Sequence, residues 1–292
     1  MPVLVPSLPS LMHCAVACFF GMLVGVAETA AAESITGARY TDPVERYGHF
    51  ALGRPHEYAR LTATTDAGRS VSLQLAENEV FEDLEPRRLR EAPDEPEQLL
   101  TIVSNRNTGS RLVLIGLRAG QLEISAQSPA TGTPMRWLNP VAIADLDGDG
   151  RADIGAVTTP HIGGTLTVYR RSGDALVAVA LLAGFSNHVY GSEELGLSVA
   201  VSISGRTHLL VPDATRRALR VIAFADRVLV EAGQCPLPAP VTGALKVEAG
   251  DAILVRLSSG PYAMRLRDCT VNLPPAKAEK PPANFSERLY RR

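Results

Sequence analysis

Short apolar and alternating segments recur along the chain after residue 40, and none of them keeps a helical period over several turns. The segments are rich in β-branched residues, and Gly, Pro, Asn, Asp and Ser separate them. Alternation with a period of two between turn-forming residues is typical of half-buried β-strands. The pattern therefore predicts an all-β protein.

The predicted strands follow a repeated order, in which two apolar segments precede an alternating one. The clearest copy is PVAIADLDGDGRADIGAVTTPHIGGTLTVYRR, and the next is LGLSVAVSISGRTHLLVPDATRRALRVIAF. Units of this kind begin near residues 47, 99, 140, 195 and 241. An outer strand follows several of them, in NEVFED, ALVAVALL, RVLVEAGQ and CTVNLP.

Antiparallel units of about three to four strands and this length are typical of propeller blades. Closing them into a ring lets each small sheet cover its neighbour and leaves only short edges. We therefore predict a β-propeller of about five blades over residues 33–272. The alternative is a β-sandwich whose strands resemble one another by chance.

Aspartates are concentrated in the loop of the clearest unit, DLDGDGRAD. Asp145, Asp147 and Asp149 occupy its positions 1, 3 and 5, and Asp153 occupies position 9. Arg151, at position 7, presents its backbone carbonyl. Calcium takes about six to eight oxygen ligands, which alternate residues of a tight loop supply. These residues are the predicted Ca²⁺ ligands, and a metal-free acidic hairpin is the alternative.

The acidic loop differs from an EF-hand, because its twelfth position is Ala156 and its flanks, VAIA and IGAV, predict strands. The spacing and the strand–loop–strand context resemble the FG-GAP/VCBS repeats of integrin-α-like β-propellers. In that family a loop of the form D-x-D-G-D-G-x-x-D binds calcium between two strands of a blade. The motif occurs once, since the equivalent segments VSISGRTH and SNRNTGS lack carboxylates. The family serves adhesion, ligand binding and hydrolysis, so the resemblance implies a fold and a metal rather than one function.

Residues 1–32 are typical of a signal peptide. The apolar run CAVACFFGMLVGVA precedes the small residues of ETAAAES, which predicts cleavage after Ala32. A membrane anchor is the alternative, although the run is shorter than the ~20 residues that a span requires. We expect a periplasmic or secreted protein with no stable membrane span after signal removal. Residues 273–292 are Pro-rich and basic, and they predict a disordered tail.

Signal removal would leave two cysteines, Cys235 and Cys269. Export into an oxidising compartment favours the pairing of a single remaining pair. We therefore predict a disulfide between the outer strands of the fourth and fifth units, with two buried thiols as the alternative.

The segment GFSNHVYGSEELG, residues 184–196, connects the third unit to the fourth. Polar groups concentrated on a loop indicate function, and in a propeller such a connection crosses one end of the ring. Asn187, His188 and Glu193 are the candidate ligand-site residues. The alternative is a connector held by local hydrogen bonds.

The remaining histidines are a weaker candidate for a metal site. His49 and His56 stand close together in RYGHFALGRPHEYARL, but HEYAR lacks the second histidine of a zinc-protease motif. A metal site would require the fold to bring them together with His161 and His208. Local hydrogen bonding of each imidazole is the alternative.

The nearly balanced charge of −2 gives no electrostatic reason to expect nucleic-acid binding. The sequence contains no nucleophile elbow, phosphate-binding Gly loop or paired-Cys zinc motif, so no catalytic residue is assigned. We therefore predict a calcium-binding interaction module for a protein or glycan. The alternatives are a propeller-type hydrolase or lyase acting on a saccharide or ester, and a structural envelope protein.

Overall fold

The computed structural model describes residues 1–2, 33–248 and 251–269. The chain divides into two units, residues 1–32 and residues 33–292. The signal-peptide prediction for residues 1–32 lies almost entirely outside the described residues, and the tail prediction for residues 273–292 lies wholly outside them. Among the described residues, no helix has the length and apolar character needed to cross a bilayer.

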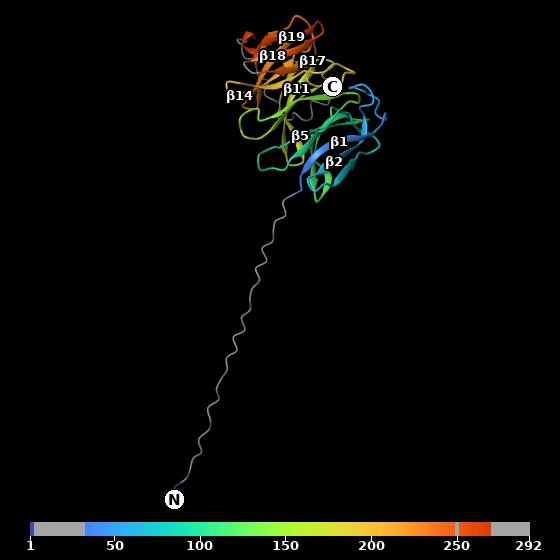
Figure 1. Ribbon diagram of the computed structural model, residues 1–292, viewed down its shortest axis with the longest axis vertical. Helices are drawn as coiled ribbons and strands as arrows, with labels where there is room; N and C mark the ends of the chain where they lie inside the picture. The colour runs from blue at the N-terminus through green and yellow to red at the C-terminus, as the bar shows by residue number, and fades with distance from the viewer. Residues whose placement is uncertain (3–32, 249–250, 270–292) are drawn as a thin grey trace. The chain divides into compact units, whose positions relative to one another are not determined.

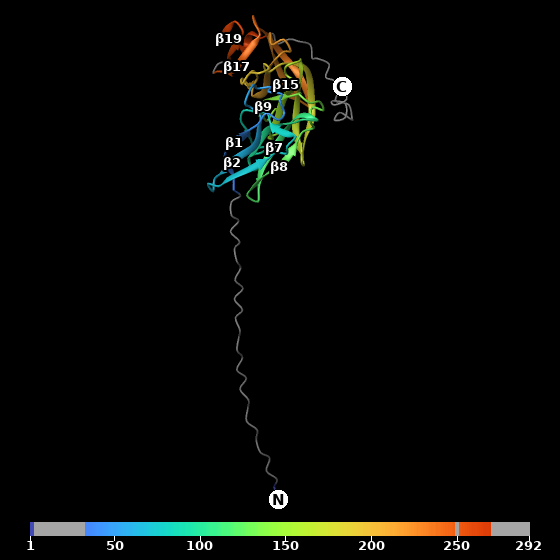
Figure 2. The same cartoon turned by 90° about the vertical axis from the view of Figure 1, so that its right-hand side faces the viewer.

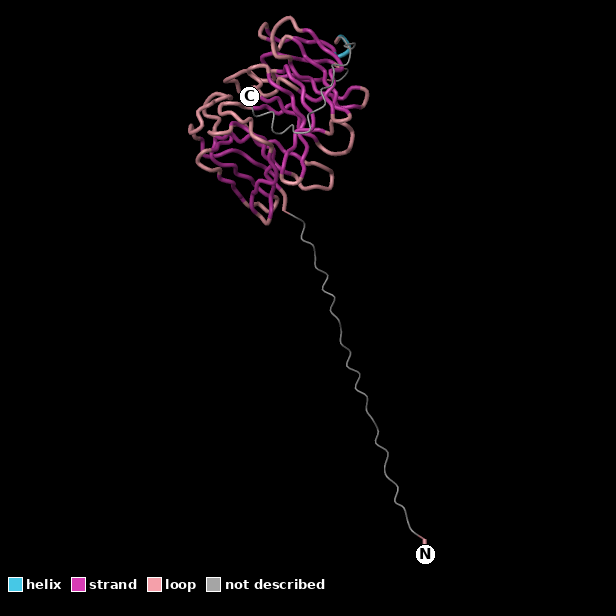
Figure 3. Tube along the Cα trace, turned by 180° about the vertical axis from the view of Figure 1, so that it is seen from behind, coloured by secondary structure: helices cyan, strands magenta, loops and turns pink. Residues whose placement is uncertain are grey.

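Antiparallel β-sheet makes up nearly all the regular structure described between residues 33 and 269, which confirms the all-β prediction (Figures 1 and 3). The described exception is a short 3₁₀ helix, Leu266–Asp268. The strands form three sheets of 12, four and three strands.

The first sheet pairs in the order β1-β2-β4-β6-β7-β8-β12-β11-β10-β9, with β3 beside β2 and β5 beside β6. All these pairings are antiparallel except a single parallel residue pair between β8 and β12. The bounds of its strands are β1 (Ile35–Pro43), β2 (Tyr58–Thr65), β3 (Ser70–Gln74), β4 (Glu79–Phe81), β5 (Arg87–Leu89), β6 (Gln98–Asn105), β7 (Gly109–Arg118), β8 (Gln121–Gln127), β9 (Leu138–Ala144), β10 (Asp153–Thr158), β11 (Gly164–Ser172) and β12 (Ala175–Phe185).

The other two sheets are simple meanders, in which strands that follow each other along the chain are hydrogen-bonded neighbours. The second contains β13 (Val199–Ile203), β14 (Arg206–Pro212), β15 (Ala218–Ala225) and β16 (Val228–Pro236). The third contains β17 (Val241–Val247), β18 (Ala252–Leu257) and β19 (Gly260–Arg265). Both views of residues 33–269 place β17 and β19 at the end opposite β1 and β2 (Figures 1 and 2).

The strand groups follow the predicted repeat units from the second unit onward. The second unit contains β6–β8, the third is the meander β9–β12, the fourth is β13–β16 and the fifth is β17–β19. Alternating burial along β18, with Ile253, Val255 and Leu257 inward, is the period of two that the sequence predicted.

The first unit differs from the prediction, because β1 precedes the predicted start near residue 47 and the segment between β1 and β2 is a loop built around Glu57. This fully buried carboxylate accepts four backbone amides. Tyr47 N and Gly48 N donate to Oε2 at 3.2 and 3.1 Å, and His49 N and Phe50 N donate to Oε1 at 3.0 and 3.3 Å. Those amides are therefore unavailable to a strand ladder, which explains why the apolar segment HFAL is not a strand.

Trp137 joins the first and third units at the centre of the largest described core cluster. Its side chain is 1% exposed, and its Nε1 donates to the backbone oxygen of Glu82 at 2.9 Å. Leu100 and Leu114 from the second unit and Ile154 from the third belong to the same cluster. Core packing therefore runs continuously through these three units.

A disulfide links the end of the second sheet to the end of the third. Cys235 on β16 and Cys269 after the 3₁₀ helix are bonded, with their Cα atoms 4.3 Å apart. This is the pair that the sequence predicted. Both residues belong to an apolar cluster that includes Leu210, Leu219 and Ile253, so the two sheets share a core as well as a covalent bond.

Replacing Glu57 tests the loop that precedes β2. We expect Glu57→Ala to lower the free energy of unfolding by about 3 kcal/mol, because hydrogen bonds to a charged acceptor are lost and buried donors are left unpaired. Urea unfolding followed by circular dichroism measures the change. The exposed Glu77→Ala is the control and should leave the midpoint unchanged. Equal midpoints for the two variants would contradict the role assigned to Glu57.

Candidate metal loop and histidine cluster

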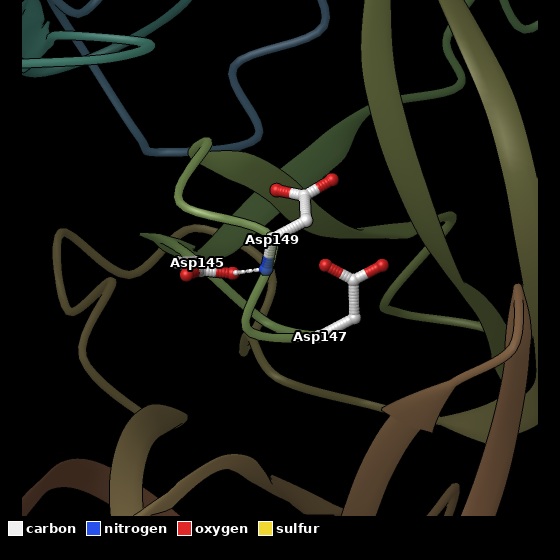
Figure 4. Close-up of side chains that lie close together, drawn as sticks. All are labelled: Asp145, Asp147 and Asp149. Atoms are coloured by element: carbon white, nitrogen blue, oxygen red, sulfur yellow. Dashed lines mark hydrogen bonds between the residues drawn. The ribbon is translucent and has the colours of Figure 1, made fainter.

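The acidic loop is the connection between β9 and β10, where Asp153 pairs in register with Ala144. Gly148 and Gly150 both have φ of 84°, a conformation that favours glycine and lets the chain turn sharply. The carboxylate of Asp145 stabilises the turn by accepting hydrogen bonds from backbone amides of the same loop. Its Oδ1 accepts from Asp149 N at 3.1 Å (Figure 4). Its Oδ1 also accepts from Gly148 N at 2.7 Å, and its Oδ2 accepts from Gly150 N at 2.9 Å.

Asp145, Asp147 and Asp149 come together as the sequence predicted. One carboxylate oxygen from each lies within 4.8 Å of the others. Figure 4 shows the three side chains arising from the same tight loop. Arg151 belongs to this loop, and its guanidinium is directed to Glu91 and Glu95 at 3.2 and 3.0 Å.

Asp153 stands apart from the other predicted ligands, because it is buried against β11. Its side chain is 1% exposed, and its Oδ1 accepts from Arg170 Nε at 2.5 Å. Its Oδ2 accepts from Leu146 N at 3.3 Å. Burial raises the pKa of the Asp153 carboxyl, and the hydrogen bond and charge of Arg170 oppose that shift.

Arg170 is the cation that the acidic loop already contains. Each of its three guanidinium nitrogens contacts a different carboxylate: Nε lies 2.5 Å from Asp153, NH2 lies 2.6 Å from Asp147, and NH1 lies 3.2 Å from Asp149. Hydrogen bonding to Asp153 raises the pKa of Arg170, so the side chain is charged at every relevant pH. The carboxylates are therefore arranged around a positive charge.

The donor set fits calcium. The predicted ligands present hard oxygen atoms on one tight loop, as calcium requires, and the guanidinium of Arg170 marks the place where they accept a cation. Asp145, Asp147, Asp149 and the Arg151 carbonyl would hold the ion, with Asp153 completing the set if Arg170 releases it. A bound calcium would neutralise the mutual repulsion of the carboxylates and brace the β9–β10 hairpin.

A cavity of about 700 Å³ lies directly beside the acidic loop. The loop forms one wall, and the turns β13–β14 and β15–β16 of the second sheet contribute the rest. Arg206, His208 and Arg227 also line it, together with Asp226 and Phe224. Within the described residues, the guanidinium groups of Arg206 and Arg227 are exposed and have no hydrogen-bond or ion-pair partner.

The candidate residues of the 184–196 segment divide into two buried groups and one exposed group. Asn187 is fully buried, and its Nδ2 donates to Asn139 O at 3.3 Å and to Ser198 Oγ at 3.1 Å. His188 is also fully buried. Glu193 is exposed and contacts His56 Nε2 at 2.8 Å. A ligand role for these residues stays a prediction, and the burial of the first two favours the connector alternative.

His188 of this segment contacts a second histidine, His161. His188 Nε2 lies 2.8 Å from the carbonyl oxygen of Ser192 and donates to it. His188 Nδ1 is then an acceptor for His161 Nε2, which lies 2.6 Å away. His161 is stacked on Trp137, with ring centroids 6.0 Å apart and an interplanar angle of 2°. Both imidazoles are therefore neutral and have defined tautomers.

His49 joins this group from the loop before β2, and Tyr190 covers it from the 184–196 segment. The rings of Tyr190 and His161 meet edge to face at 5.3 Å, and those of Tyr190 and His49 at 5.8 Å. His49 Nδ1 lies 2.9 Å from Glu82 Oε1, an electrostatic contact without hydrogen-bond alignment. We call His49, His161 and His188 the histidine cluster. His56 and His208 make other contacts.

Burial lowers the pKa values of the paired histidines. Desolvation, with the charge of His188 and His49, lowers the pKa of His161 to about 3. Desolvation lowers that of His188 to about 4, although its hydrogen bond to Ser192 acts in the opposite direction. Among the described residues, the acidic loop is the one group of three or more potential ligands close enough to hold a metal. The described contacts of His161 and His188 are packing against Trp137 and hydrogen bonds.

Arg170 and Glu82 are the important residues that the sequence analysis missed. The register pairs Ile154 with Tyr169, which places Asp153 opposite Arg170 on the neighbouring strand. A sequence reader who aligned the two strands would find that pair. Glu82 lies in the segment NEVFED, which was predicted to be an outer strand. No local pattern indicates that the fold buries this carboxylate with Ser104 and His49.

Comparisons with known proteins do not identify the chain. No family model matches it, and no curated protein does so. Among solved structures it resembles a candidate 6-phosphogluconolactonase from Bacteroides fragilis NCTC 9343, with 13% identity and a TM-score of 0.40. The match covers 79% of this chain and 71% of that one. A TM-score of 0.40 is too low to transfer architecture or activity.

The paired histidines predict a loss of stability in acid. Because their folded pKa values of about 3 and about 4 lie below the ordinary 6.5, the unfolded chain takes up protons first as the pH falls. The stability present above pH ~6.5 should therefore decline toward pH ~4 by an amount on the order of 3 kcal/mol for each of the two histidines. Urea unfolding at a series of pH values measures it.

The same titration with His161→Asn isolates this contribution. The variant should be less stable at neutral pH and should lose less stability on acidification than the wild type. His208→Asn, which removes a histidine outside the cluster, should keep the wild-type slope. Parallel curves for wild type and His161→Asn would show that the pair does not contribute.

Proposed function

We propose that this protein is an exported calcium-binding β-propeller of the FG-GAP/VCBS type, with about five blades, that acts as a binding module for an acidic glycan. The consecutive meanders support the blade organisation. The single observation that carries the function is the cavity lined by the acidic loop and two unpaired arginines, Arg206 and Arg227. The sequence of residues 1–32 and the disulfide support the proposed periplasmic or secreted localisation.

The chemistry of the cavity favours a sugar acid over a protein partner. Its volume of about 700 Å³ suits a small polar ligand rather than a broad flat interface. Calcium on one wall would bind a ligand carboxylate or hydroxyl, and the arginines of the cavity would pair with further carboxylates. Thr207 and His208 supply hydrogen-bonding groups in the same cavity.

The rival function, a propeller-type hydrolase or lyase, is favoured by the convergence of histidines and a buried carboxylate. His49, His161 and Glu82 come from distant parts of the sequence and lie close together. A general base works best with a pKa near the working pH, however. With a pKa of about 3, His161 is a weak base at neutral pH. Binding is therefore the better-supported function.

The calcium site predicts stabilisation by the metal. Addition of calcium to the chelator-treated protein should raise its melting temperature, because a ligand bound only by the folded state stabilises that state by mass action. Asp147→Ala should abolish most of the rise. Glu85→Ala, the same substitution at an exposed acidic residue outside the loop, should retain the rise in melting temperature. Identical melting curves of the wild type in calcium and in chelator would overturn the calcium site.

The cavity predicts calcium-dependent binding of a uronate oligosaccharide. Isothermal titration with oligogalacturonate should give binding in calcium and none in chelator, with neutral maltooligosaccharide as the negative control. Arg206→Ala combined with Arg227→Ala should weaken binding about tenfold or more, since two charge-assisted contacts are lost. Arg118→Ala, exposed and outside this cavity, should bind as the wild type does. Equal affinity for all three proteins would place the ligand elsewhere.

A further inference from the structure

The acidic loop of the β9–β10 hairpin is already neutralised in part by a side chain of the neighbouring strand, β11. Asp147, Asp149 and Asp153, three of the four predicted carboxylate ligands, contact the guanidinium of Arg170. Arg170 is partly buried, with 26% of its side chain exposed, so these contacts are shielded from solvent more than surface ion pairs are. The metal-free loop is therefore stabilised by an internal cation.

Calcium at this loop would compete with Arg170 for the same carboxylates. Asp153 Oδ1 lies 2.5 Å from Arg170 Nε, and Asp147 Oδ2 lies 2.6 Å from NH2. Calcium binds oxygens at about 2.3–2.6 Å, and two positive groups cannot share a lone pair at these distances. Repulsion between the guanidinium and a divalent ion would add to the competition.

Arg170 already lies over an aromatic ring while it contacts the aspartates. Its Cζ lies 5.4 Å from the ring centroid of Phe224, and Phe224 lines the cavity beside the acidic loop. An arginine released from the aspartates can stay stacked on an aromatic ring and keep its head in the solvent of the cavity. The exchange therefore needs a side-chain rotation rather than a rearrangement of the sheet.

We propose that Arg170 and calcium are alternative cations of the acidic loop, so that Arg170 stabilises the metal-free protein and weakens its affinity for calcium. This inference rests on the proposed calcium site and concerns its regulation. In the absence of metal, Arg170 ties Asp153 and Asp147 together across the hairpin. At sufficient calcium the ion takes those carboxylates, and the guanidinium leaves them while it keeps its contact with the Phe224 ring.

Calorimetric titration of calcium into the chelator-stripped full chain tests the exchange, with Arg170→Met as the key variant. Methionine keeps much of the side-chain length and removes the charge. The variant should bind calcium about tenfold more tightly than the wild type or better, because the competing charge-assisted hydrogen bonds are gone. In chelator its melting temperature should be below that of the wild type, and in saturating calcium the difference should close.

Arg220→Met is the matched control. Arg220 also contacts one carboxylate, Glu231 at 2.6 Å, and lies 4.1 Å from the ring centroid of Phe185, but it is remote from the acidic loop. Its substitution should lower stability equally in calcium and in chelator and leave the calcium Kd unchanged. If Arg170→Met does not fold in chelator, Arg170→Gln is titrated instead. Folding of either variant at calcium concentrations that leave the wild type unaffected also supports the exchange.

The outcomes separate the two proposals. If wild type and Arg170→Met bind calcium with the same Kd within about twofold, the exchange is wrong and the calcium site stands. If only the variant binds calcium, Arg170 excludes the ion from the native loop, which supports competition and overturns the proposed calcium requirement. If neither binds calcium at up to about 10 mM, above the usual range of extracellular calcium modules, both proposals fail.

Discussion

Compensation of buried carboxylates is the constraint on which the loops of this protein depend. A carboxylate removed from water is destabilising unless hydrogen bonds or a cation replace its hydration. Glu57 satisfies the requirement with four backbone amides, and Asp83 with Arg87, Tyr40 and its neighbour's amide. Asp153 satisfies it with Arg170 and a backbone amide. Each set of hydrogen bonds and ion pairs fixes the conformation of a segment that the strand pairings alone do not fix.

The 184–196 segment connects parts of the chain that the sheets keep separate. Gly191 N donates to Ala51 O in the loop before β2, and Ser186 Oγ accepts from Arg216 in the second sheet. Gly196 O accepts from Leu245 N in the third sheet. Together with the buried histidine pair, these bonds make the segment a junction. Its concentration of polar residues thus has a structural explanation. This explanation agrees with the alternative of a connector held by hydrogen bonds, which the sequence alone left open.

The acidic loop combines the two properties that a regulated site requires. Its carboxylates attract a cation, and the fold supplies one that is tethered, the guanidinium of Arg170. Because Arg170 sits on β11, directly across from Asp153, the charge that we propose competes with calcium is held on the strand next to the hairpin that carries the aspartates. The cavity beyond it, lined by Phe224 and two free arginines, gives the exchange a connection to ligand binding. The proposed metal site and the proposed ligand cavity therefore share the loop between β9 and β10.

Sequence alone determined the class of fold, the strand groups from the second unit onward, the cysteine pair and the clustering of three aspartates. These features depend on local periodicity, on turn residues and on spacing within one loop, all of which are visible in a short window of the chain. The start of the first unit was misjudged, because Glu57 draws its amides from residues 47–50 and cancels their strand pattern. No local signal shows that a carboxylate will be buried.

Tertiary structure alone decided which groups the aspartates face and which histidines meet. The contact of Arg170 with Asp147 and Asp149 spans more than 20 residues of sequence, and the cross-strand contact of Arg170 with Asp153 depends on the register of β10 and β11. His49 and His161 come together through packing around Trp137, Tyr190 and Glu82. Such meetings depend on the register of strands and on which loops share one end of the sheets. Those are properties of the whole chain, so no segment of the sequence encodes them by itself.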